Sequence, residues 1–288
     1  MDGVINFLKP PGMSSNAAVV FLRKLLNVKK IGHTGTLDPG ACGVLPICVG
    51  KATRISNYMM DDKKEYIAEV TFGKSTDTGD SYGSVTQISQ VPLPADQDVI
   101  EALKSFTGRI TQQTPAYSAV KVGGKKRYDL ARKGLELPEQ YREVQIYDIE
   151  YLGQTQADAH RLRVMCGKGT YIRTLCEDLG KALGQCAYMS FLARTQCAGL
   201  SIDDAITEDE LKNNIAADIL LPMGPFLTKL PRVDAPSEQR EKLFHGVSIQ
   251  IAMQDIETAC IYAGNELMGI GSVKDGMAKI NTRLVDGE

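Results

Sequence analysis

The sequence predicts an α+β fold in which a mixed sheet carries helices on its faces. Segments with the pattern of strands outnumber those with the pattern of helices, and the two kinds do not alternate as in parallel βαβ folds. Beyond residue 230, short apolar segments are separated by glycines, which is typical of a compact all-β unit. We therefore predict two domains, residues 1–229 and residues 230–288.

The N-terminal part of the chain is predicted to contain one helix and two strands. Ser14 and Ser15 precede an apolar repeat that reaches Leu26, which is the pattern of a helix with a serine N-cap. Residues 44–49 form a short apolar run, and residues 65–72 place apolar side chains on one face. Both patterns indicate strands.

The middle of the chain is predicted to add a helix and two more strands. Residues 74–81 are polar and contain glycine, so we expect a loop there. Asp96 is expected to cap a helix that is ended by Gly108. Residues 144–152 and 161–166 have the composition of strands.

The last part of the chain is predicted to contain one helix followed by the all-β domain. Gly167 and Gly169 turn the chain into a helix that Thr170 is expected to cap. The inward side of this helix is formed by Leu175, Leu179 and Leu183. The short apolar segments of the all-β domain are residues 247–251, 258–263 and 266–270.

Composition excludes several classes of protein. No stretch approaches 18 consecutive apolar residues, and the N-terminus lacks the pattern of a signal peptide. The seven cysteines are scattered without a Cys-x-x-Cys pair, so we expect reduced thiols in a cytoplasmic protein. The three histidines lie far apart, and no P-loop or dinucleotide-binding pattern is present. We therefore expect neither a metal nor a nucleotide cofactor.

Two segments concentrate basic charge in a chain whose net charge is only −2. Residues 3–37 carry basic side chains and no acidic one, and residues 121–133 carry a basic cluster against Asp129 alone. Such segments could bind a polyanion, or they could form a solvated basic face. The cluster includes Lys121, Lys125, Lys126, Arg127 and Arg132.

One carboxylate, Asp38, lies in a loop of small residues that spans residues 32–46. Glycines and prolines flank it, so backbone geometry shapes the loop more than packing does. Asp-Pro and Pro-Gly pairs also form ordinary turns. From these residues alone, a simple turn and a carboxylate presented to a substrate are both open.

Six motifs, taken in order, resemble the TruB family of tRNA pseudouridine synthases. One of them is the Asp38 loop, and the resemblance covers most of the chain. The other motifs are residues 9–15, the segment from Lys64 to Thr78, the block from Pro115 to Arg132, residues 167–175 and residues 191–195. Two positions depart from the family pattern: Cys42 stands where threonine is frequent, and Ala193-Arg194 stand where two arginines are common. The second departure is expected to weaken one phosphate or loop contact.

The resemblance implies a pseudouridine synthase fold with a mainly antiparallel sheet, and a PUA-like RNA-binding domain at residues 230–288. It implies that Asp38 is the catalytic residue and that Arg173 pairs with it. It also implies that the substrate is bound by His33, Tyr66, Tyr171, Leu192 and Lys9. The target base lies inside folded RNA, so the enzyme must flip it out of the stack. Aromatic and apolar side chains can then hold the flipped base by stacking and contact.

Each of these residues also has an ordinary structural interpretation. Arg173 could pair with Glu177 one helical turn away. Tyr66, Tyr171 and Leu192 could be core side chains. In the same way, His33 could cap a turn and Lys9 could be a solvated surface lysine.

The resemblance further implies isomerisation of the T-loop uridine of tRNA, uridine-55 of the TΨC arm, to pseudouridine. We expect a cytoplasmic monomer that binds the tRNA T-arm and requires neither a cofactor nor a protein partner. Whether Asp38 acts as a nucleophile at C1′ or as a base at the sugar stays open. Two alternatives remain: a guide-dependent synthase that acts on ribosomal RNA, and a non-catalytic RNA-binding or RNA-folding module.

Overall fold

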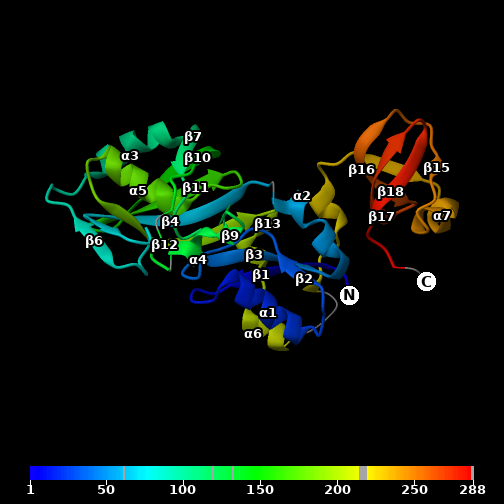
Figure 1. Ribbon diagram of the computed structural model, residues 1–288, viewed down its shortest axis with the longest axis horizontal. Coiled ribbons are helices and arrows are strands. Elements are labelled where there is room, and N and C mark those ends of the chain that lie inside the picture. The colour runs from blue at the N-terminus through cyan, green and yellow to red at the C-terminus, as the bar shows by residue number, and fades with distance from the viewer. Residues whose placement is uncertain (61, 119, 132, 136, 214–218, 287–288) are drawn as a thin grey trace.

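The computed structural model describes residues 1–60, 62–118, 120–131, 133–135, 137–213 and 219–286 (Figure 1). Its main feature is a sheet with the strand order β1-β3-β12-β4-β11-β10-β7, to which β2 is added on β3 and β13 on β12. All pairs in this sheet are antiparallel except the parallel contact between β3 and β12. The predicted mixed, mainly antiparallel sheet is therefore confirmed.

The strands of the main sheet are β1 (Gly3–Lys9), β2 (Ile31–His33), β3 (Cys42–Val49), β4 (Lys64–Phe72), β7 (Gly108–Gln113), β10 (Tyr141–Gln156), β11 (Ala159–Cys166), β12 (Ala187–Cys197) and β13 (Leu200–Ser201). Two small hairpins lie beside it, formed by β5 (Lys74–Thr76) with β6 (Val85–Ile88) and by β8 (Lys121–Val122) with β9 (Lys125–Lys126). The first hairpin begins inside the segment 74–81, so our prediction of a loop there was only partly correct.

Seven α-helices and several short 3₁₀ helices are present among the described residues. The α-helices are α1 (Ser15–Leu25), α2 (Ser56–Met60), α3 (Asp96–Leu103), α4 (Arg127–Ala131), α5 (Ile172–Ala182), α6 (Glu208–Asn213) and α7 (Arg240–Phe244). The 3₁₀ helices are Gly50–Arg54, Lys104–Phe106, Ile202–Asp204, Gly224–Leu227 and Ser237–Gln239. None of the helices among the described residues has the length and apolarity needed to cross a membrane.

Capping differs from the prediction at two of the three expected sites. Ser14 caps α1 as expected, since its side chain accepts a hydrogen bond from the backbone of Ala17. The N-cap of α3 is the residue before Asp96, and Asp98 accepts from that residue's amide. Thr170 donates to a backbone carbonyl instead of capping α5, because the chain becomes helical one residue later than the pattern suggested.

The core of the main sheet is one apolar cluster to which α1 and α5 contribute from different parts of the chain. Leu22 from α1 and Leu175 and Leu179 from α5 are fully buried in it. Figure 1 shows α1 and α6 beside β1 and β3, and α3 and α5 beside β10, β11 and β12. The apolar faces that sequence periodicity predicted are thus the faces that cover the sheet.

A second sheet follows at the C-terminus, with the strand order β14-β16-β17-β18-β15. Figure 1 shows it beside α2 and away from β7 and α3. Its strands are β14 (Arg232–Ala235), β15 (Ile249–Gln250), β16 (Ile256–Ala263), β17 (Glu266–Lys274) and β18 (Met277–Arg283). An apolar cluster joins the two sheets, since Val44 and Met59 pack in the same cluster as Cys260 and Ile270. This region is β-rich, but it also contains α7 and the 3₁₀ helix Ser237–Gln239, so the predicted all-β fold is only partly correct.

Candidate active site

Asp38 lies in the loop between β2 and β3, where backbone hydrogen bonds define the chain's path. The amide of Ala41 donates to the carbonyl of Asp38 at 3.1 Å, which closes a tight turn. The amide of Gly12 donates to Pro39 O at 2.8 Å and ties this turn to the segment after β1. The carboxylate itself is 35% exposed. The turn and the accessible carboxylate, which we weighed as alternatives, therefore occur together.

Ser15 fixes the residue before Asp38. Its hydroxyl accepts from the amide of Leu37 at 2.8 Å and donates to Leu37 O at 2.9 Å. Ser15 is buried at the start of α1, and the side chain of Leu37 is buried in the main core. The two serines of the first motif thus have different tasks, because one caps the helix and the other holds the Asp38 loop.

Arg173 pairs with Asp38 across 135 residues of sequence. Its Nε lies 2.9 Å from Asp38 Oδ2, and its Nη2 lies 3.4 Å from Asp38 Oδ1. This two-point contact fixes the orientation of the carboxylate. The alternative that Arg173 pairs with Glu177 is not what the geometry shows.

The guanidinium of Arg173 is itself held on its other side. Nη1 donates to Thr78 O at 2.8 Å, and Nη2 donates to Tyr117 O at 2.8 Å. The side chain is only 5% exposed, so these carbonyls replace water as acceptors. Arg173 is therefore a rigid positioning group for Asp38.

Lys9 is fully buried, and its ammonium group lies between backbone carbonyls. Nζ donates to Pro10 O at 2.8 Å, to Met13 O at 2.7 Å and to Pro39 O at 3.3 Å. Burial lowers the pKa of Lys9 to about 8, although the nearby charge of Asp38 acts in the opposite direction. The interpretation as a solvated lysine is excluded, and the contact with Pro39 supports the loop.

Tyr66 and Leu192 lie on neighbouring central strands. Tyr66 is on β4 opposite Arg194, and Leu192 is on β12 opposite Ala68. Both side chains are 7% exposed. Burial raises the pKa of Tyr66 to about 12, so its hydroxyl stays protonated, and Arg194 hydrogen-bonds to it. Cys42, one of the two departures, is half-buried and its thiol donates to Leu192 O at 3.7 Å.

Arg194 has a role that our sequence analysis missed. We treated it as the remainder of a phosphate or loop contact, but its side chain is fully buried. Nε donates to Val44 O at 2.8 Å and Nη2 donates to Gly35 O at 3.2 Å. These bonds hold the chain before and after Asp38. Gly43 is required beside it, because its φ is +107° and an added Cβ would lie 2.2 Å from Arg194 O. The sequence signal that could have indicated this buried role is an arginine within a largely apolar strand.

Tyr171 immediately precedes α5 and is half-buried. Gln112 on β7 fixes its backbone, accepting from the amide of Tyr171 at 2.9 Å and donating to its carbonyl at 3.2 Å. The guanidinium of Arg142 lies 5.4 Å from the centre of the tyrosine ring. Gln112, fully buried, is a second positioning residue that no sequence pattern indicated.

His33 is the last residue of β2, where it pairs with Ile47 of β3 and is half-buried. It therefore lies at the base of the loop that carries Asp38. Within the described part of the chain, no group of three His, Cys, Asp or Glu side chains could hold a metal ion.

The basic segment contains one error in our prediction. Arg127 was expected to contact RNA phosphates, but it is 3% exposed, and it donates to Pro115 O at 3.2 Å and to Pro138 O at 3.0 Å. Arg127 therefore links the two ends of the stretch that contains the basic segment, because it donates to a carbonyl before it and to a carbonyl after it. Lys125 is exposed in the β8–β9 hairpin. For Lys121 and Lys126 only the backbone is described, and Arg132 lies outside the described residues.

We expect Arg127→Ala and Lys125→Ala to act on different properties. Arg127→Ala removes a buried side chain and its two hydrogen bonds to part-buried carbonyls, which lowers the free energy of unfolding by about 1 kcal/mol. Lys125→Ala leaves stability unchanged but reduces the slope of RNA affinity against salt by about one. Thermal unfolding and filter binding at several salt concentrations measure the two effects. An Arg127→Ala variant with wild-type stability contradicts the structural role of this arginine.

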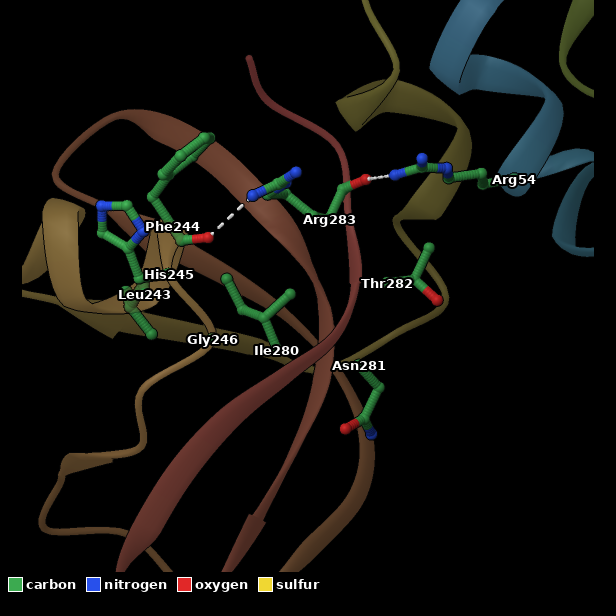
Figure 2. A pocket seen from close by; sticks show the side chains of 9 residues that line it. All are labelled: Arg54, Leu243, Phe244, His245, Gly246, Ile280, Asn281, Thr282 and Arg283. Carbon is green, nitrogen blue, oxygen red and sulfur yellow. Dashed lines mark hydrogen bonds between the residues drawn. The ribbon is translucent and has the colours of Figure 1, made fainter. Parts of the chain in front are cut away.

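The C-terminal sheet borders a cavity of about 530 Å³, which Figure 2 shows from close by. Phe244 and Gly246 line it, and so do the arginines 54 and 283. Arg54, from the 3₁₀ helix after β3, donates to the carbonyl of Arg283. The guanidinium of Arg283 lies 4.3 Å from the centre of the Phe244 ring and donates to Phe244 O at 3.0 Å. His245 is exposed at its edge.

Taken together, the Asp38 site presents one partly exposed carboxylate oriented by a buried arginine. Apolar and aromatic side chains from β4 and β12, and Tyr171 before α5, belong to the same end of the sheet. A carboxylate of this kind can act as a nucleophile or as a base toward a bound substrate.

Comparison with known proteins assigns the chain to a family. The model described as "TruB family pseudouridylate synthase (N terminal domain)" matches residues 23–172. The model described as "tRNA pseudouridylate synthase B C-terminal domain" matches residues 173–225.

Relatives and solved structures agree with these matches. A tRNA pseudouridine synthase B of Alkaliphilus oremlandii is 43% identical over 96% of this chain and 94% of the relative. One of Streptococcus gordonii is 44% identical over 94% of this chain and 95% of the relative. Among solved structures, a chain in an H/ACA RNP bound to a substrate RNA containing 2′-deoxyuridine has a TM-score of 0.73 at 25% identity. The match covers 99% of the present chain and 85% of the chain in the solved structure. With two family models over residues 23–225 and 43% identity across nearly its whole length, this chain belongs to the TruB family of tRNA pseudouridine synthases.

Proposed function

We propose that this protein isomerises the T-loop uridine of tRNA, uridine-55 of the TΨC arm, to pseudouridine, with Asp38 as its catalytic residue. The observation that carries the proposal is the two-point contact between Arg173 and the partly exposed carboxylate of Asp38. A carboxylate held in one orientation is what attack on a sugar carbon or abstraction of a sugar proton requires.

The reaction needs no redox change and no group donor. The bond between N1 and C1′ breaks, the uracil turns, and C5 joins C1′, while the proton of C5 is lost and N1 gains one. Asp38 acts at the sugar, either as nucleophile at C1′ or as base.

The remaining site residues bind the uridine in this proposal. Tyr66 and Leu192, buried on adjacent strands, form the surface against which the uracil lies. Tyr171 forms a second aromatic wall. His33, at the base of the loop, takes the place of the flipped base in the RNA stack, and Lys9 holds the loop.

The RNA is bound by surfaces outside this site. We propose that residues 1–229 form the catalytic domain and that residues 230–288 form a PUA-like RNA-binding domain. The cavity with two arginines and an aromatic ring suits RNA, because arginines bind phosphates and an aromatic ring stacks on bases. The protein acts in the cytoplasm as a monomer on the tRNA T-arm, without a cofactor or protein partner.

An assay on unmodified tRNA transcript tests this function. The purified protein alone should convert one uridine of the T-loop, and a transcript with cytidine at that position should give no product. Formation of pseudouridine only after addition of a guide RNA or partner proteins refutes the stand-alone enzyme and supports the guide-dependent alternative. RNA binding without any turnover supports the non-catalytic module.

A further inference from the structure

Tyr82 is the most exposed large apolar side chain among the described residues, at 69% exposure. It lies in the loop between β5 and β6, outside the set of residues that the family resemblance assigns to the site. Its ring offers an exposed apolar face on which another ring can stack.

The ring of Tyr82 rests on the catalytic loop. A Cβ built on Gly40 would lie 2.0 Å from Tyr82 Cε2, 2.7 Å from Cδ2 and 2.9 Å from Cζ. One side of the ring is therefore against the backbone two residues after Asp38. A side chain at position 40 would displace the ring.

The loop that carries Tyr82 is held rigidly by its own hydrogen bonds. Asp80 Oδ1 accepts from the amide of Tyr82 at 3.0 Å and from Thr78 Oγ1 at 2.6 Å. The carboxylate of Asp77 accepts from the amide of Ser84 at 2.8 Å, and this bond joins the two ends of the loop. Such a loop presents its aromatic side chain in one position, so little entropy is lost on binding.

The same loop contacts the catalytic pair and the central sheet. Thr78 O accepts from Arg173 Nη1 at 2.8 Å, and Gly79 O accepts from the amide of Met189 on β12 at 3.0 Å. The ring of Tyr82 is thus fixed relative to both Asp38 and its arginine. The ring therefore lies on the loop that carries Asp38, and the backbone of its own loop is tied to Arg173.

We propose that Tyr82 stacks on the base of a nucleotide that flanks the target uridine in the RNA loop. This inference rests on the proposed function. When the uridine turns out of the stack, its neighbour loses a stacking partner, and an exposed ring beside the catalytic loop replaces it. Tyr82 is a binding residue in this role, and it acts on RNA affinity more than on the chemical step.

The test combines protein variants with T-arm stem-loops that lack one base. Tyr82→Ala is compared with Tyr82→Phe, which keeps the ring, and with Val85→Ala, which removes another exposed apolar side chain from the same hairpin. The RNAs are the intact unmodified stem-loop and two versions with an abasic sugar, one on each side of the target uridine. RNA affinity, KM and the single-turnover rate at saturating RNA are measured for each pair.

We expect Tyr82→Ala to weaken binding to intact RNA and raise KM by about tenfold. The saturating single-turnover rate stays within about threefold, and Tyr82→Phe and Val85→Ala behave as wild type. On one of the two abasic RNAs, Tyr82→Ala and wild type bind equally, because the stacking partner is gone. The proposal is overturned if the loss is absent, or if it is equally large on all three RNAs.

A second measurement does not depend on turnover. The chain contains no tryptophan, so Tyr82→Trp introduces a single tryptophan, whose fluorescence is excited selectively over that of the tyrosines. Its fluorescence should be quenched by the intact stem-loop and not by the abasic RNA that lacks the stacked base. Equal fluorescence with both RNAs refutes the stacking. If wild type forms no pseudouridine yet this quenching and the affinity loss occur, the proposed function fails while the role of Tyr82 in RNA binding stands.

Discussion

Asp38→Asn should abolish pseudouridine formation while RNA affinity stays within about tenfold of wild type, or roughly 1.4 kcal/mol. The amide has the size of the carboxylate and can still accept from Arg173, so the loop keeps its shape. It carries no negative charge, however, and is neither a nucleophile nor a base at neutral pH. The chemical step therefore disappears, whereas the surfaces that bind RNA remain.

Single-turnover assays on unmodified transcript and filter binding measure the two quantities. Asp209→Asn is the matched control, because Asp209 is 89% exposed on α6 and its neutralisation should leave both unchanged. Thermal unfolding confirms that the Asp38 variant is folded. Turnover by a folded Asp38→Asn protein would show that another group performs the reaction.

Arg173→Lys should lower the single-turnover rate by about 100-fold or more, even though the positive charge is kept. Lysine ends in a single ammonium group, so it cannot contact both oxygens of Asp38 and also both carbonyls, Thr78 O and Tyr117 O. The carboxylate then loses its fixed direction. Loss of these hydrogen bonds to part-buried carbonyls lowers the free energy of unfolding by about 1 kcal/mol.

Arg161→Lys provides the control for this substitution. Arg161 pairs with Glu69 on the surface at 3.2 Å and is 45% exposed, so exchange for lysine should change neither rate nor stability. The rate is measured at saturating RNA and at a temperature well below the melting point of the variant, which separates positioning from unfolding. A rate for Arg173→Lys within threefold of wild type would contradict the positioning role.

The regular elements of this protein were largely predictable from local patterns. Strands β4 and β11 follow from alternating apolar residues, and α1 follows from its serine cap and apolar repeat. The mixed sheet and the β-rich C-terminal region follow from the order of these elements along the chain. Capping was less predictable, since Asp96 and Thr170 each lie one residue from the actual N-cap. Competing hydrogen bonds near a helix start decide that choice.

The candidate site was predictable only as a set of motif residues. Nothing in the local sequence around Arg173 distinguishes a partner in Asp38 from a partner in Glu177. The distinction comes from the fold, in which the start of α5 reaches the loop between β2 and β3. Arg127 shows the opposite error, because a basic residue among lysines looks exposed until its carbonyl partners are known.

The sequence by itself thus determined several of the strands and helices, the family resemblance and the one carboxylate in a glycine-rich loop, but not β1 or the central strand β12. These depend on neighbours within a few residues and on motif order. Only the tertiary structure decided which charged side chains are buried, which carbonyls Lys9 and Arg194 satisfy, and that the ring of Tyr82 lies on Gly40. The physical reason is that burying a charge is favourable only with its partners in place, and those partners come from distant parts of the chain.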